Sequence, residues 1–98
     1  MRLTQKEQKA IKETFLEIFP TGDIYLFGSR VDDTKRGGDI DLYIVLEKKL
    51  ALSALFNNKI DFLVELKGKI GEQKIDVLIS KDKNRLIEQE ALKKGIKL

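Results

Sequence analysis

Residues 39–47, DIDLYIVLE, are the part of the sequence that most constrains the fold. Carboxylates alternate with Ile and Leu at the start of this segment, and the run then becomes wholly apolar. Side chains of a strand alternate between its two faces, so both aspartates leave the same face while the apolar remainder has to be buried. Such a strand needs cover from other elements, and its polar end is where we expect function to be located.

Two more apolar runs, residues 24–27 and 74–79, predict further strands. Three amphipathic patterns predict helices around them. The first follows a capping box of Thr4 and Glu7 and ends at Pro20. The second begins near Leu52 and ends near Gly68 or Gly71, and the third is capped by Asp82 and followed by Gly95 as its C′ residue.

The predicted order is helix, strand, strand, helix, strand, helix. This order is typical of an α/β (α+β) fold in which a small mixed β-sheet is covered by helices. The first two strands, joined by the polar residues 30–38, are expected to pair directly, and the third follows a helix as in a crossover unit. Residues 1–98 form a single domain, with room for one modest core and none for a second substrate-binding domain.

The composition limits the available chemistry. The chain has no Cys and no His, which excludes disulfides, zinc sites of the usual kind, thiol nucleophiles and imidazole acid–base catalysis. Its net charge of +3 is spread over scattered Lys and Arg residues, which is typical of a solvated surface rather than of a nucleic-acid footprint. No apolar run approaches the ~20 residues of a membrane span, and the start lacks a signal peptide, so we expect a cytoplasmic protein without membrane contact.

Three features carry the candidate chemistry. Gly28 and Ser29 follow an apolar strand, where a glycine lets backbone N–H groups approach an anion and the hydroxyl adds a donor. Asp39 and Asp41 share one face of a strand and are suited to share a metal ion. Asp76 interrupts an apolar strand, where a buried carboxylate would need compensation by a cation. If the second and third strands are neighbours, ~4.8 Å apart, the three carboxylates form a compact triangle.

Each feature also has an ordinary structural interpretation. A glycine–serine pair after a strand is commonly only a turn, and an Asp-x-Asp pair at a strand start can protect an edge or cap a turn. Asp76 could be a strand-end residue or the ion-pair partner of a lysine such as Lys74. The combination of all three features is more specific than any one of them. Oxygen ligands suit Mg²⁺, and two such ions about 3.5–4 Å apart can serve a nucleotidyl transfer.

These motifs resemble those of the minimal nucleotidyltransferases of the DNA polymerase β superfamily. The resemblance rests on Phe27-Gly28-Ser29-Arg30, Asp39-Ile40-Asp41-Leu42 and Ile75-Asp76-Val77, and it covers nearly the whole chain. It implies a polymerase β-like palm fold with a pair of Mg²⁺ ions and a nucleoside triphosphate substrate such as ATP. It also implies roles for the residues: Gly28, Ser29 and Arg30 bind the nucleotide, Asp39 and Asp41 bind both metals, and Asp76 binds one metal and deprotonates the acceptor hydroxyl.

The loop residues Lys35 and Arg36 are further candidates for phosphate contacts, although a solvated loop is the simpler interpretation. Small members of this family are commonly paired with a helical HEPN protein in toxin–antitoxin modules, and some attach AMP to a tyrosine of that partner. The resemblance therefore implies an antitoxin that transfers NMP to a hydroxyl of a HEPN partner.

Two other functions stay open at the level of sequence. The first is a non-catalytic antitoxin that neutralises a HEPN toxin by direct binding. The second is an enzyme that acts on nucleic acid, which the sequence favours least because most of its aromatic residues fall on apolar stripes or in buried strands.

Overall fold

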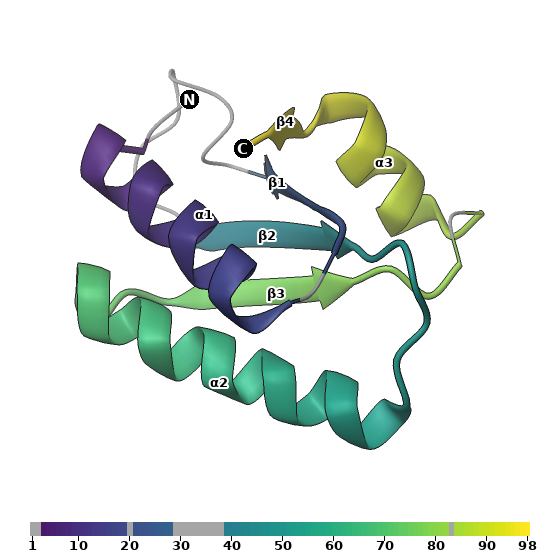
Figure 1. Ribbon diagram of the computed structural model, residues 1–98. Coiled ribbons are helices and arrows are strands. Elements are labelled where there is room, and N and C mark those ends of the chain that lie inside the picture. Colours follow the sequence, from purple (N-terminus) through teal and green to yellow (C-terminus); the bar gives the residue numbers. More distant parts are fainter. Residues whose placement is uncertain (1–2, 20, 29–38, 83) are drawn as a thin grey trace.

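The computed structural model describes residues 3–19, 21–28, 39–82 and 84–98. Within these ranges the chain forms three helices and four strands. In chain order they are α1 (Gln5–Ile18), β1 (Asp23–Phe27), β2 (Ile40–Val45), α2 (Leu52–Ile70), β3 (Ile75–Ile79), α3 (Leu86–Lys94) and β4 (Ile96–Lys97) (Figure 1). The predicted order of helices and strands is therefore confirmed, with one short strand added at the end.

The four strands form one mixed sheet in the order β3-β2-β1-β4. β1 and β2 pair antiparallel, as expected for two strands joined directly, and β2 and β3 pair parallel across the crossover through α2. β4 adds an antiparallel edge, with Leu26 opposite Ile96. β4 was not predicted, because a strand of two residues is too short to show the alternation of apolar and polar side chains that marks a strand.

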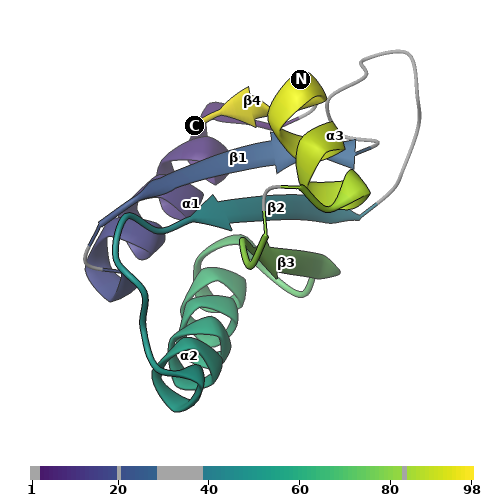
Figure 2. The same cartoon turned by 90° about the vertical axis from the view of Figure 1, so that its right-hand side faces the viewer.

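Helices cover both faces of the sheet, α1 and α2 on one face and α3 on the other (Figures 1 and 2). Between the sheet and the first two helices lies the hydrophobic core. Its buried members are Leu3, Ala10, Ile11, Phe15, Phe19, Ile24, Leu26, Ile40, Leu42, Ile44, Phe62, Leu66, Ile75 and Val77. Alternation along β2 then directs Asp41 and Tyr43 to the face that α3 covers in part. The predicted two-faced strand is therefore present.

Two of the predicted helix ends are confirmed. Thr4 and Glu7 form a reciprocal capping box, with hydrogen bonds of 2.9 and 3.0 Å. Gly71 is the C-cap of α2 and has a φ of 92°, a conformation that glycine adopts without strain. Gly68 lies inside the helix, and Pro20 lies outside the described residues.

The predicted start of α3 was wrong. Its N-cap is Arg85, and no side chain caps this helix end. Asp82 instead accepts a hydrogen bond from the backbone N–H of Asn84 at 2.9 Å, so it forms a local turn before the helix. At the other end Gly95 is the C-cap with a φ of −71°, so it is not the left-handed C′ residue that the sequence suggested.

A buried glutamate, Glu88, joins α3 to the sheet. The Glu88 side chain is fully buried and accepts a hydrogen bond of 2.8 Å from the hydroxyl of Tyr43 in β2. It accepts three more, from the Ser80 hydroxyl and from the backbone N–H groups of Lys81 and Asp82. Burial raises its pKa, but these hydrogen bonds outweigh that effect and lower the pKa of Glu88 from 4.5 to about 2. A polar anchor therefore joins α3 to the sheet.

Among the helices of the described residues, none combines the length and the apolar character that crossing a membrane would require.

Candidate active site

Parallel pairing of β2 and β3 brings two of the three predicted carboxylates side by side. Asp41 and Asp76 are register partners, and Asp39 directly precedes β2, two residues before Asp41. All three lie where β2 and β3 begin, at the left-hand end of these arrows in Figure 1. The sequence left open whether the second and third strands are neighbours, and the structure shows that they are.

The end of β1 lies close to the Asp41 carboxylate, and Gly28 makes this approach possible. It directly follows β1, whose last residue Phe27 lies opposite Asp41. Gly28 has a φ of +78°, and a Cβ atom built on it would overlap the Oδ2 atom of Asp41 and lie 3.1 Å from its Cγ atom. Only glycine allows this approach, because any side chain would have to displace the Asp41 carboxylate. The rest of the predicted nucleotide-binding set, Ser29 and Arg30, and the loop candidates Lys35 and Arg36, lie outside the described residues.

The electrostatics of the site centre on Asp41. Partial burial raises the pKa of the Asp41 carboxyl group, and the neighbouring charges of Asp76 and Asp39 raise it further, while Lys74 acts in the opposite direction. The Lys74 Nζ atom lies 3.3 Å from the Oδ2 atom of Asp39. The hydrogen bond with Asp39, together with its charge, raises the pKa of Lys74. The negative charges of Asp39, Asp41 and Asp76 therefore repel one another, and the positive charge of Lys74 compensates them in part.

Two expectations about Asp76 need correction. Its side chain is exposed, because Asp76 lies on an edge strand and on the face of the sheet that α3 covers only in part. The cost of burying a carboxylate therefore does not apply to it. Lys74 forms its ion pair with Asp39 rather than with Asp76. Exposure suits Asp76 to contact with a second molecule.

An aromatic wall beside the carboxylates was not predicted as part of the site. The Phe27 ring lies against the Tyr43 ring at a centroid distance of 6.5 Å, edge to face, and Tyr25 packs on Tyr43 at 6.1 Å. These rings share the face of Asp41, since Tyr25 pairs with Tyr43 and Phe27 with Asp41. The sequence signal for this aromatic cluster was the spacing of Tyr25 and Phe27, which are two positions apart in β1 and therefore lie on the same face.

The donor atoms of this site suit a hard divalent cation. The predicted compact triangle of Asp39, Asp41 and Asp76 is not formed as a three-carboxylate metal site: within the described ranges, no group of three or more His, Cys, Asp or Glu side chains is arranged so that it could hold a metal ion, and Lys74 pairs with Asp39 instead. Asp41 and Asp76 nevertheless present carboxylate oxygens from directly paired positions, and Mg²⁺ is commonly bound in proteins through one or two carboxylates, with water and substrate phosphates as its other ligands. The residues present therefore fit Mg²⁺ in donor chemistry and in charge.

The described residues thus form an α/β domain with a mixed sheet between helices, in which acidic side chains lie where two strands begin, beside a closely packed glycine. The chain belongs to the polymerase beta nucleotidyltransferase family, whose model, described as "Polymerase beta, Nucleotidyltransferase", matches residues 9–98. The predicted family and the polymerase β-like fold are confirmed. Among curated proteins, none matches the sequence significantly.

Several solved structures have the same fold. A toxin–antitoxin structure with AMP-PNP gives a TM-score of 0.69 at 20% identity, covering 92% of this chain and 70% of the other. A mutant of the toxin–antitoxin pair MntA–HpeT gives 0.67 at 20% identity over 93% of this chain and 70% of that one. The tri-AMPylated Shewanella oneidensis HEPN toxin in complex with MNT antitoxin gives 0.62 at 18% identity, with coverages of 93% and 70%. At these identities the likeness concerns the fold.

Proposed function

We propose that this protein is a Mg²⁺-dependent nucleotidyltransferase of the minimal, antitoxin type. It transfers AMP from ATP to a hydroxyl group of a HEPN-domain partner protein, with which it forms a hetero-oligomer. The observation that carries the proposal is the direct pairing of Asp41 and Asp76 on adjacent strands, with Asp39 two residues away and Gly28 against Asp41. We place the reaction in the cytoplasm, where ATP is supplied.

Each residue has a task in this transfer. Bound Mg²⁺ would lower the pKa of the attacking hydroxyl and offset the charge of the leaving diphosphate. Asp39, Asp41 and Asp76 would hold the ions, and Gly28, Ser29 and Arg30 would bind the triphosphate. The acceptor oxygen forms a bond to the α-phosphorus, the bond from that phosphorus to the bridging oxygen breaks, and diphosphate leaves. Asp76, whose side chain is exposed, takes the hydroxyl proton.

The resting arrangement of the site supports a cation-dependent reaction. Lys74 pairs with Asp39 at 3.3 Å, whereas Asp41 and Asp76 face each other as like charges on paired strands. A divalent cation removes this repulsion more completely than one exposed lysine does. The ion pair of Lys74 therefore has to loosen when Asp39 joins the metal ligands.

The identity of the partner rests on the fold relatives. The similar structures are toxin–antitoxin complexes, one of them with AMP-PNP and one with a tri-AMPylated HEPN toxin. We therefore infer that the acceptor hydroxyl lies on a partner protein of the same kind.

Transfer of label from ATP tests this function directly. The protein is incubated with Mg²⁺, with ATP labelled at the α-phosphate, and with the product of the adjacent gene, which the proposal expects to be a HEPN protein. We expect label on the partner, and its loss with Asp41→Asn or Asp76→Asn. The control is Asp61→Asn, which changes an exposed carboxylate on α2 and should leave transfer unchanged. No label with the unaltered protein, or equal label with every variant, would contradict the proposal.

Neutralisation by binding alone is the second candidate. It is favoured by the ion pair between Lys74 and Asp39, which leaves that carboxylate occupied. Under this alternative the protein silences its partner equally well after Asp39→Asn and Asp41→Asn are combined, and no label is transferred.

A further inference from the structure

The outer edge of β3 is open. The N–H group of Ile40 donates to the carbonyl of Lys74 at 3.0 Å, and that of Ser80 donates to the carbonyl of Ile44 at 2.8 Å. Alternation along β3 therefore turns the backbone groups of residues 75, 77 and 79 away from β2. β3 is the first strand in the sheet order, and no strand of the described residues pairs with this edge. Unpaired edge groups are a template for a further strand.

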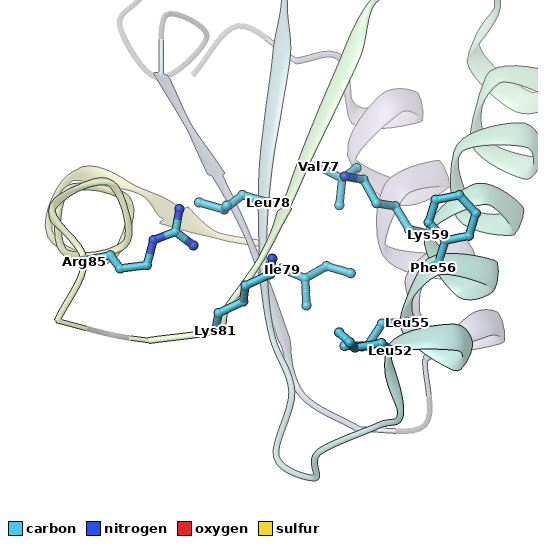
Figure 3. Close-up of a pocket in the computed structure, with 9 residues that line it drawn as sticks. All are labelled: Leu52, Leu55, Phe56, Lys59, Val77, Leu78, Ile79, Lys81 and Arg85. Atoms are coloured by element: carbon cyan, nitrogen blue, oxygen red, sulfur yellow. The ribbon is translucent and has the colours of Figure 1, made fainter.

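A groove of about 450 Å³ runs along the same edge, between α2 and the start of α3 (Figure 3). Val77, Leu78 and Ile79 of β3 form its floor. On the α2 side Leu52 and Phe56 line it with side chains that are 79% and 65% exposed. Large apolar side chains are seldom grouped and exposed in this way on a surface that has no partner.

The charges around the groove select its occupant. Lys59, Lys81 and Arg85 line it, and no acidic residue of the described chain does. Because Arg85 pairs with Glu88, a second copy of this protein docked edge to edge would bring Lys59 and Lys81 against the same two lysines, which disfavours a homodimer through β3. A segment that carries carboxylates is complementary to the groove.

We propose that this groove docks an extended segment of the acceptor protein, in which apolar and acidic residues alternate, as an added strand on the free edge of β3. The inference rests on the proposed function, because Asp76 immediately precedes Val77 of the groove floor. A strand laid along β3 has one end beside Asp76, so the residue that follows it presents its hydroxyl to the carboxylates. Backbone hydrogen bonds supply affinity in such docking, and side chains on alternate faces supply specificity.

A synthetic peptide tests the docking without any nucleotide. The probe is a fluorescein-labelled peptide of about ten residues, a usual strand length, that alternates Val with Glu. We expect it to bind the unaltered protein and to shift the amide NMR signals of Ile75, Val77 and Ile79. The same peptide with Lys in place of Glu, or with alternate N-methyl groups facing β3, should bind at least about tenfold more weakly.

Charge reversal at the groove provides the matched comparison. Lys59→Glu combined with Lys81→Glu should weaken binding of the Glu peptide about tenfold, as expected for two reversed rim charges. Lys12→Glu combined with Lys93→Glu makes the same change in net charge on other exposed surfaces and should leave binding unchanged. Arg85 is kept, because it lies 3.7 Å from the buried Glu88 carboxylate.

Failure of the docking site and failure of the proposed function give different results. The groove variant should keep Mg-ATP binding and bind the Glu peptide about tenfold more weakly, whereas Asp41→Asn should lose Mg-ATP binding and keep peptide binding. Equal binding of the Glu and Lys peptides, or shifts outside β3 and α2, would overturn the docking proposal. The proposal would also be overturned if the free protein sedimented as a dimer and the amides of Ile75, Val77 and Ile79 were protected from hydrogen exchange.

Discussion

Replacing Glu88 by Gln should remove the polar anchor between α3 and the sheet. The carboxylate accepts hydrogen bonds from the Tyr43 and Ser80 hydroxyls at 2.8 and 2.6 Å, and its second oxygen accepts two backbone N–H groups at 3.1 and 2.9 Å. Glutamine has one acceptor oxygen and one amide group that only donates. With that oxygen on the two backbone N–H groups, the amide has to donate to the Tyr43 and Ser80 hydroxyls, which turn to accept, and the charge-assisted hydrogen bonds of the carboxylate are lost.

The pKa of Glu88 sets the size and the pH dependence of this loss. Its shift from 4.5 to about 2, at 1.36 kcal/mol for each unit, corresponds to about 3 kcal/mol of stability when the group is ionised. The pKa is lower in the folded than in the unfolded chain. The contribution is therefore fully present above about pH 4.5 and is lost as the pH falls towards about 2.

Urea unfolding followed by circular dichroism measures both effects. We expect Glu88→Gln to lower the free energy of unfolding by about 3 kcal/mol at neutral pH, and the difference from the unaltered protein to shrink steadily below about pH 4.5. Glu90→Gln is the control, since this exposed residue on the same helix pairs with the exposed Lys94 at 3.3 Å and should change stability by less than about 0.5 kcal/mol. A difference that is the same at every pH, or below about 1 kcal/mol at neutral pH, would refute the assigned role of the buried carboxylate.

Three further predictions concern the candidate active site. Gly28→Ala should lower the free energy of unfolding by about 1–2 kcal/mol, because residue 28 has a φ of +78°, and it should weaken Mg-ATP binding in calorimetry, because the added Cβ atom displaces the Asp41 carboxylate. If neither the free energy of unfolding nor the Mg-ATP affinity changes, the glycine has no such role. Asp41→Asn should raise the free energy of unfolding by up to about 1 kcal/mol in EDTA, since it removes one of two like charges on paired strands, and a decrease would contradict this. Lys74→Gln should bind Mn²⁺ up to about fivefold more tightly in a titration, because the competing cation at Asp39 is gone, whereas weaker binding would show that Lys74 does not compete.

The sequence predicted the parts of this protein that depend on local patterns. The pairing of the first two strands and the crossover to the third follow from the order of elements, and the two-faced character of β2 follows from its alternation. The proximity of Asp41 to Asp76 needed one more fact, the strand order. The capping box at Thr4 is equally local, because both of its hydrogen bonds join residues three positions apart.

What the sequence did not predict depends on contacts between distant residues. Glu88 was not singled out, since a glutamate on an amphipathic helix is ordinarily solvated, and its burial depends on Tyr43, which is 45 positions away in the sequence. The choice of Asp39 rather than Asp76 as the partner of Lys74 is likewise set by side-chain geometry between strands. The open groove beside β3 follows from the strand order, which the sequence left undetermined.

Broadening of amide NMR signals by Mn²⁺ tests whether the grouped carboxylates bind a divalent cation. With Mn²⁺ added well below the protein concentration, we expect broadening centred on the amides of Gly28, Asp41 and Asp76, and its loss in Asp41→Asn combined with Asp76→Asn. Mg²⁺ in excess should reverse it. Broadening spread over exposed acids elsewhere, such as Glu13 on α1, or unchanged in the double variant, would show that this end of the sheet is not the metal site.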